Sequence, residues 1–148
     1  MYARILVPID GSATGNDGLS EAIDLAKQLG SKLVLLHVVE DFAISLELAS
    51  VASFEDTRAA LHEAGRSMLD KAASRAAASG VLSETVLNEQ TAGRASDAIL
   101  KQAKEQRCEL IVMGTHGRRG LDRVVMGSDA ELVLRGAAVP VLMVRHPH

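Results

Sequence analysis

A glycine-rich stretch joins two regular segments of this chain: Gly114-Thr115-His116-Gly117-Arg118-Arg119-Gly120. The apolar run 110–113 before it is typical of a buried strand, and residues 129–135 beyond it are typical of a helix. Such a connection lets the backbone approach phosphate oxygens, and the free amides and dipole of the helix favour an anion. With Gly127-Ser128 at its far end, the stretch indicates a phosphate-binding loop. The alternative is that its glycines only make turns.

The composition predicts one globular domain, residues 1–148. A chain of 148 residues with 47% apolar residues can bury a substantial core. The net charge is −3, and the aromatic residues are Tyr2, Phe42 and Phe54. Nucleic-acid binding requires a basic face and favours stacking rings, so we expect no nucleic-acid partner.

The sequence also indicates a soluble, cytoplasmic protein. A single cysteine, Cys108, excludes an internal disulfide and fits a reducing compartment, where a packed thiol is expected. The chain runs from Met1 directly into a strand pattern, without the features of a signal peptide. Its apolar runs fall short of the roughly 18 residues that span a bilayer, so no membrane association is expected.

Strand-like and helix-like segments alternate along the chain. Strands are predicted at residues 4–10, 32–39, 84–89, 109–113 and 139–144, and helices at 14–29, 55–79, 94–106 and 129–135. Thr14 and Asp17 have the spacing of a capping box at the start of the first helix, which Gly30 should end. Residues 40–53 mix acidic and apolar side chains and indicate a loop with a short helix.

This alternation predicts a three-layer α/β domain with a five-stranded parallel sheet. Strands one, two and four are the most apolar and should lie in the middle. The third strand is more polar, and Pro140 cannot donate to a ladder, so strands three and five should form the edges. The resulting order is 3-2-1-4-5. Its winding reverses between strands one and four, where such folds bind ligands, beside Asp10 and Gly114.

The glycine-rich stretch matches neither common nucleotide fingerprint. The lysine of a Walker-type loop is missing before Ser128, and the first turn has only Asp10-Gly11-Ser12 where dinucleotide-binding folds carry several glycines. The pattern present is Gly-x2-Gly-x9-Gly-Ser. Gly114 and Gly117 would let amides turn inward, Ser128 would supply a hydroxyl and an amide, and arginines 118, 119 and 123 could neutralise phosphate charge.

The whole chain resembles the universal stress protein family, and the Gly-x2-Gly-x9-Gly-Ser spacing is the most specific part of the likeness, typical of the ATP-binding branch. The matching segments are Ile5-Leu6-Val7-Pro8-Ile9-Asp10-Gly11-Ser12, Leu35-Leu36-His37-Val38, Val112-Met113-Gly114-Thr115-His116-Gly117-Arg118, Gly127-Ser128 and Val139-Pro140-Val141-Leu142-Met143-Val144-Arg145. The resemblance implies a Rossmann-like fold and an ATP-binding, stress-response module without dedicated catalysis. It also implies a homodimer joined through the strand at residues 139–145.

Carried over residue by residue, the resemblance also implies a binding site. Adenine and ribose would lie against the ends of the first two strands, with a ribose hydroxyl on Asp10. Mg²⁺ or Mn²⁺ would accompany the ATP. The implied cofactor-binding residues are Pro8, Ile9, Asp10, Ser12, Val38, Met113, Gly114, His116, Gly117, Arg118, Gly127, Ser128, Asp129 and Ala130.

One position departs from the family pattern. Asp129 stands where the family more often has a small apolar residue, and its carboxylate would repel a γ-phosphate unless it points away. Three arginines across residues 114–131 are balanced by Asp122, Asp129 and Glu131, so the loop has no net formal positive charge.

Each singled-out residue also has a purely structural interpretation. Ser128, with Glu131 three residues later, could serve simply as a helix cap, and Asp10 could serve simply to cap a turn. His37, in an apolar strand, fits a hydrogen-bonded core histidine better than a ligand. His116 could contact phosphate or be a solvated loop residue. The histidines lack metal-ligand spacing, so no structural metal is predicted.

No sequence feature supplies a catalytic residue. A Gly-x-Ser-x-Gly elbow is missing, and no general base is recognisable for phosphoryl transfer. The leading hypothesis is therefore an ATP-binding regulatory module. The alternatives are an interaction module of the same fold without a nucleotide, and a slow ATP hydrolase or phosphotransferase.

Overall fold

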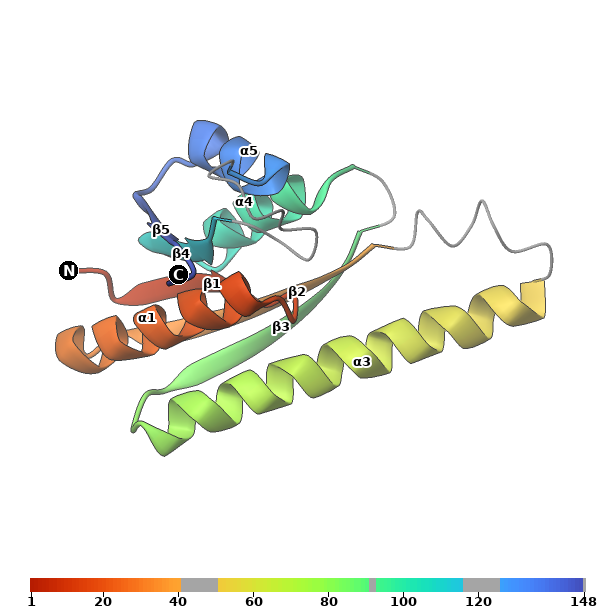
Figure 1. Ribbon diagram of the computed structural model, residues 1–148, viewed down its shortest axis with the longest axis horizontal. Coiled ribbons are helices and arrows are strands. Elements are labelled where there is room, and N and C mark those ends of the chain that lie inside the picture. Colours follow the sequence, from red (N-terminus) through yellow and green to blue (C-terminus); the bar gives the residue numbers. More distant parts are fainter. Residues whose placement is uncertain (41–50, 91–92, 116–125, 148) are drawn as a thin grey trace.

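The chain folds around a five-stranded parallel sheet with helices on both of its faces (Figure 1). The computed structural model describes residues 1–40, 51–90, 93–115 and 126–147. Its elements are β1 (Arg4–Pro8), α1 (Ala13–Leu29), β2 (Lys32–Glu40), α3 (Val51–Ala78), β3 (Ser83–Gln90), α4 (Ala95–Glu105), β4 (Leu110–Gly114), α5 (Ser128–Gly136) and β5 (Val141–Val144).

The strand order is β3-β2-β1-β4-β5, which confirms the predicted order. All four pairings are parallel, and the register pairs Leu6 of β1 with Val34 of β2 and with Ile111 of β4. The more polar β3 and the strand after Pro140 form the two edges, as expected from their sequences. The reversal of winding therefore falls between β1 and β4.

Two apolar clusters, one on each face, explain why the middle strands are apolar throughout. Ile5 and Val7 of β1 pack with helices α1 and α3, whereas Leu6 packs with α4 and α5. All three side chains are fully buried. A strand buried on both faces has no position for an exposed polar side chain, as expected for the centre of a parallel sheet.

The start of α1 differs from the prediction. Thr14 lies inside the helix rather than at its N-cap, so the predicted capping box of Thr14 and Asp17 is wrong. Ser12 is the N-cap instead, and its Oγ accepts a hydrogen bond of 3.0 Å from the Gly15 N–H. A serine at the N-cap satisfies one of the amides that the first turn leaves without a partner. Gly30 ends the helix as predicted, with a left-handed φ of 69°.

Two other element boundaries differ from the prediction. α3 begins at Val51 rather than at residue 55, so it takes in part of the segment expected to be a loop with a short helix. β5 begins at Val141, just after Pro140, rather than at residue 139. The ring of proline removes the N–H that a strand residue needs. Residues 41–50 of the expected loop lie outside the described residues.

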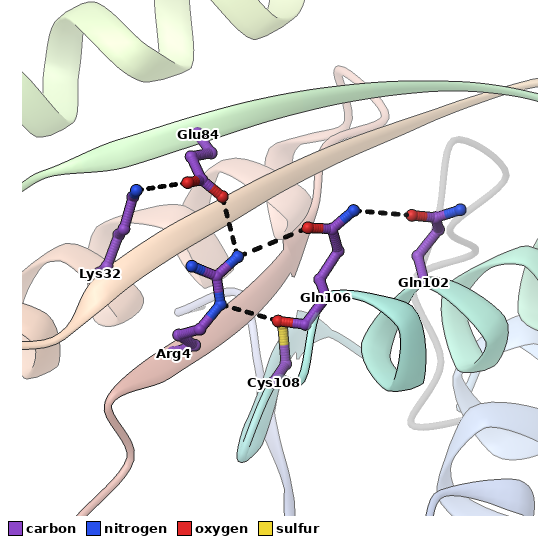
Figure 2. Close-up of polar contacts among 6 residues, drawn as sticks. All are labelled: Arg4, Lys32, Glu84, Gln102, Gln106 and Cys108. Carbon is purple, nitrogen blue, oxygen red and sulfur yellow. Dashed lines mark hydrogen bonds and ion pairs between the residues drawn. The ribbon is translucent and has the colours of Figure 1, made fainter.

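A polar cluster ties three strands and one helix together at the amino end of the sheet (Figure 2). Arg4 of β1 donates from Nη2 to Glu84 Oε2 of β3 at 2.8 Å and from Nε to the carbonyl oxygen of Gln106 at 2.7 Å. Lys32 of β2 forms a second ion pair with Glu84. Hydrogen bonds from Lys32 and Arg4 lower the pKa of the Glu84 carboxyl from 4.5 to about 2.

Cys108 lies beside this cluster and is 5% exposed, in line with a packed thiol. Burial raises the pKa of its thiol to about 11, so the sulfur stays protonated at neutral pH. Among the described residues, no helix has the length and apolarity to cross a membrane.

The Glu84 cluster predicts a pH-dependent contribution to stability. A carboxyl group with a lowered folded-state pKa stabilises the protein above its unfolded pKa, and this contribution disappears as the pH falls toward the folded pKa. Glu84→Gln should therefore lower the melting temperature at pH 7. The difference from wild type should shrink as the pH falls from about 4.5 toward 2. Thermal unfolding followed by circular dichroism checks this, and a difference that is constant with pH would contradict it.

Candidate functional site

The candidate site lies where the carboxyl ends of β1 and β4 meet. These strands are neighbours in the sheet, with Ile5 paired to Leu110 and Leu6 to Ile111. The chain leaves β1 toward α1 on one face of the sheet and leaves β4 toward α5 on the other. The connections therefore diverge at this point, which is where open α/β sheets bind ligands.

The turn after β1 is organised by Asp10 and Ser12. Asp10 Oδ1 accepts hydrogen bonds from the Ser12 N–H at 2.9 Å and from the Ser12 hydroxyl at 2.6 Å. The same hydroxyl oxygen accepts from Gly15 N–H as the N-cap of α1. One oxygen of the Asp10 carboxylate therefore stabilises its own turn. The ribose contact implied for this residue stays a prediction.

Gly114 brings the end of β4 into direct contact with the first turn of α1. A Cβ atom at this position would lie 2.6 Å from both the carbonyl carbon and the carbonyl oxygen of Thr14. Gly18, one turn further along α1, is also close, since its Cβ would lie 3.2 Å from the Gly114 nitrogen. Glycine at 114 is thus required by packing, independently of any ligand.

Thr115 anchors the segment that follows. Its N–H donates to the Val144 carbonyl oxygen at 2.9 Å, and its own carbonyl accepts from the Gly127 N–H at 2.7 Å. Thr115 is 5% exposed. Both ends of the glycine-rich connection are thereby held beside β4. Three predicted site residues, His116, Gly117 and Arg118, lie outside the described residues.

The start of α5 differs from the starts of α1 and α4. Ser12 caps α1, and Asp97 Oδ2 of α4 accepts from the Arg94 N–H at 3.0 Å. The N-cap of α5 is Gly127, which has no side chain to cap with. Ser128 is the first helical residue and is exposed, so the interpretation that it caps the helix is wrong.

The N-cap residue of α5 therefore leaves the first backbone amides of the helix without a cap from its own side chain. Ala130 is buried in the core at 3% exposure and fixes the helix against the sheet. Asp129 is half-buried, and Glu131 forms an ion pair with Arg135 further along the helix at 2.8 Å. The acidic residues at 129 and 131 partly offset the positive end of the helix dipole.

The remaining predicted residues divide between the two faces of the sheet. Val38 and Met113 pack with the cluster on the α4 and α5 face, and Val38 is half-buried. Ile9 packs in the cluster on the α1 and α3 face, so only its backbone can face the other side. The register of β1 with β2 ends at Pro8, paired with Leu36, which leaves Val38 beyond the end of β1.

Two residues at this site were not among the predicted site residues. Thr14 contacts Gly114, and Thr115 anchors the glycine-rich connection. Thr14 follows the turn after β1 and Thr115 follows Gly114, and these positions were the only signal in the sequence. Both residues act through backbone atoms, which a side-chain motif does not reveal. In the part of the chain that the structure describes, no three His, Cys, Asp or Glu residues gather into a metal site.

Known proteins are similar to this chain over nearly its full length. A universal stress protein of Methanocaldococcus jannaschii is 34% identical over 147 residues, which are 99% of this chain and 84% of that protein. Universal stress protein YxiE of Bacillus subtilis is 31% identical over 151 residues, covering 98% of this chain and 100% of that protein. The solved structure of another M. jannaschii protein has a TM-score of 0.88 at 24% identity and covers 100% of this chain and 99% of that one.

Two further solved structures share the fold and hold nucleotides. A universal stress protein in complex with cAMP has a TM-score of 0.69 at 22% identity, with 97% of each chain covered. An Arabidopsis thaliana universal stress protein family member with AMP bound has a TM-score of 0.70 at 19% identity, covering 98% of this chain and 92% of that one.

The family signature extends over the same range as these likenesses. The signature of the universal stress protein family matches residues 1–145. Strand order, chain coverage and signature agree with one another. The chain therefore belongs to the universal stress protein family.

Proposed function

We propose that this protein binds ATP at the carboxyl ends of β1 and β4 and acts as a regulatory module in stress response. The observation that carries the proposal is the start of α5. Its N-cap, Gly127, has no side chain that could compete with an anion for the first amides of the helix. Gly127 is also held beside β4 through its hydrogen bond to Thr115, and Gly114 at the end of β4 packs against Thr14 in the first turn of α1.

The class of ligand is supported by proteins of the same fold. One holds AMP and another holds cAMP, and both ligands combine an adenine ring, a ribose and a phosphate group. In this chain the phosphates would bind at Gly127, Ser128, Asp129 and Ala130. The adenosine would lie toward Pro8, Asp10 and Val38, with Met113 and Gly114 between the two ends.

A divalent cation would arrive with the nucleotide. Mg²⁺ and Mn²⁺ bind oxygen ligands, and Mg²⁺ is commonly held by phosphate oxygens together with one or two protein groups. The Ser128 hydroxyl at the start of α5 supplies an oxygen ligand, which fits this preference. The cation would shield phosphate charge from the Asp129 carboxylate.

The contacts at the site support binding rather than catalysis. Ser12 and Asp10 form a hydroxyl–carboxylate pair, which in an enzyme could be a nucleophile and its base. Here the Ser12 oxygen also accepts from Gly15 N–H, and Asp10 Oδ1 also accepts from Ser12 N–H. Both groups are therefore engaged in shaping the turn and capping α1.

An interaction module without a nucleotide is the second candidate. The acidic pair Asp129 and Glu131 in the first turn of α5 favours it, because these carboxylates already complement the helix dipole and would repel phosphate. This candidate and the ATP-binding module differ in a property that is directly measurable, the affinity for ATP.

ATP binding should be measurable, and replacing Gly127 should weaken it. A valine there would place a side chain beside the amides that receive phosphate, so we expect Gly127→Val to raise the ATP Kd at least tenfold. Calorimetric titration with ATP and Mg²⁺, with mass spectrometry of nucleotide released from freshly purified protein, checks this. Gly114→Val is a less specific variant, because its side chain would strike the Thr14 backbone and perturb packing.

The outcomes separate the candidates. No co-purified nucleotide and no heat at millimolar ATP would favour the interaction module. Multiple turnovers of ATP above roughly 1 s⁻¹, the low end of ordinary enzymes, would instead favour a hydrolase or phosphotransferase.

Asp129 should weaken ATP binding through its charge. Asp129→Asn keeps the size of the side chain and removes the repulsion at a helix N-terminus, so the ATP Kd should fall roughly two- to fivefold. The Kd of adenosine, which has no phosphate, should not change. Glu131→Gln is the matched control, because Glu131 is paired with Arg135, and it should have a smaller effect. An unchanged ATP Kd in Asp129→Asn would mean that the phosphates bind elsewhere.

The proposed homodimer would form through the edge strand β5. The carbonyl oxygens of Pro140 and Val144 accept hydrogen bonds from β4. Successive residues of a strand direct their backbone groups to opposite sides, so the N–H groups of Val141 and Met143 point to the open edge of the sheet. Met143→Pro should therefore remove an intermolecular hydrogen bond and yield monomers. Met143→Ala, which keeps the N–H, should stay dimeric. Sedimentation equilibrium checks both, and a dimeric proline variant would place the interface elsewhere.

A further inference from the structure

His37 is a buried histidine with a defined partner. It is 8% exposed, and its Nδ1 lies 2.7 Å from the carbonyl oxygen of Ile9. A carbonyl oxygen can only accept a hydrogen bond, so Nδ1 carries the proton. The imidazole ring thus donates across the end of the sheet, from β2 to the residue that follows β1.

The Ile9 backbone is held by β2 on both sides of the residue. Its N–H donates to the carbonyl oxygen of Leu36 at 2.7 Å, and its carbonyl accepts from the His37 ring. The register of β1 with β2 ends one residue earlier, at Pro8. The hydrogen bond from the His37 side chain therefore joins the chain to β2 at Ile9, one residue beyond the end of β1 and just before Asp10.

A glycine in the middle of α3 accommodates the imidazole ring. A Cβ atom at Gly65 would lie 2.4 Å from Cδ2 and 3.0 Å from Nε2 of His37, and 3.0 Å from Leu87 Cδ1. Glycine inside a helix lowers the helix–coil equilibrium constant about fivefold relative to alanine, so its presence here calls for a packing reason. The close approach of α3 to the ring supplies that reason. α3 runs along β2 and β3 in Figure 1.

We propose that His37 is a positioning residue for the nucleotide site, which holds the Ile9 carbonyl and so fixes the backbone that carries Asp10. Gly65 lets α3 press against the ring and hold it in place. Val38, the next residue along β2, packs on the opposite face, beyond the end of β1. His37 therefore connects α3 to the backbone that precedes Asp10, on the face of the sheet opposite Val38. The inference rests on the proposed function for its ligand, but its structural part is testable without nucleotide.

The test compares three variants in ATP affinity and in nuclear magnetic resonance signals of the nucleotide-free protein. His37→Leu keeps apolar volume and removes the donor, and it should raise the ATP Kd by up to about tenfold, the range of one hydrogen bond. His37→Asn has a side-chain amide that can donate from nearly the same place, and it should restore the Kd to within about threefold. In wild type, imidazole ¹⁵N shifts should place the proton on Nδ1.

Gly65→Ala provides an independent arm that keeps His37 intact. Helix propensity alone predicts that this change stabilises the protein. The proposal instead predicts a weaker ATP affinity and shifted backbone amide signals at Ile9, Asp10 and Ser12. Ala64→Gly is the matched control, because residue 64 is exposed on the same helix, and it should leave the ATP Kd and those signals unchanged.

Each outcome bears on one of the two proposals. If wild type binds no ATP, the proposed function fails, and the amide signals of His37→Leu and Gly65→Ala still decide the positioning role. A folded His37→Leu protein with unchanged Kd and unchanged Asp10 signals would overturn the inference and leave His37 as a core residue only. If His37→Leu does not fold, the ATP Kd and amide signals of Gly65→Ala and His37→Asn decide the positioning role instead.

Discussion

Burial of the central strands on both faces is the constraint on which the structure depends. β1, β2 and β4 have no exposed face, so helices must cover both sides of the sheet, and each strand must be followed by a crossover. Successive crossovers can cover both sides only if the winding reverses once, and here it does so between β1 and β4. The candidate site is located by this reversal, before any individual side chain is considered.

The two helices that start at this site have different means of satisfying their first amides. α1 is capped by Ser12, which is itself held by Asp10. α5 starts after Gly127 and has no cap of this kind. α1 thus begins with a side-chain cap and α5 begins without one at its N-cap, which is why the proposal places the anion at α5.

The fold could be predicted from the sequence because apolar runs and their bounding residues report burial directly. The polar β3 and Pro140 identified the edges, and Gly30 identified a helix end. The cap of α1 was predicted wrongly, because Thr14 and Asp17 match a spacing that Ser12 and Gly15 satisfy in three dimensions. The contact between His37 and Ile9 joins residues 28 positions apart, and no local pattern indicates it. The functional roles of the site residues remain predictions, and His116, Gly117 and Arg118 lie outside the described chain.

Thr115 has a consequence for how the site tolerates change. Its carbonyl oxygen joins the end of β4 to the start of α5 through Gly127, and its N–H ties the same residue to β5 through Val144. Both hydrogen bonds use backbone atoms of Thr115, so most side-chain substitutions at this position would preserve them. Proline would not, because it lacks the N–H that donates to Val144. A change that shifts the Thr115 backbone would therefore displace β5 and the start of α5 together.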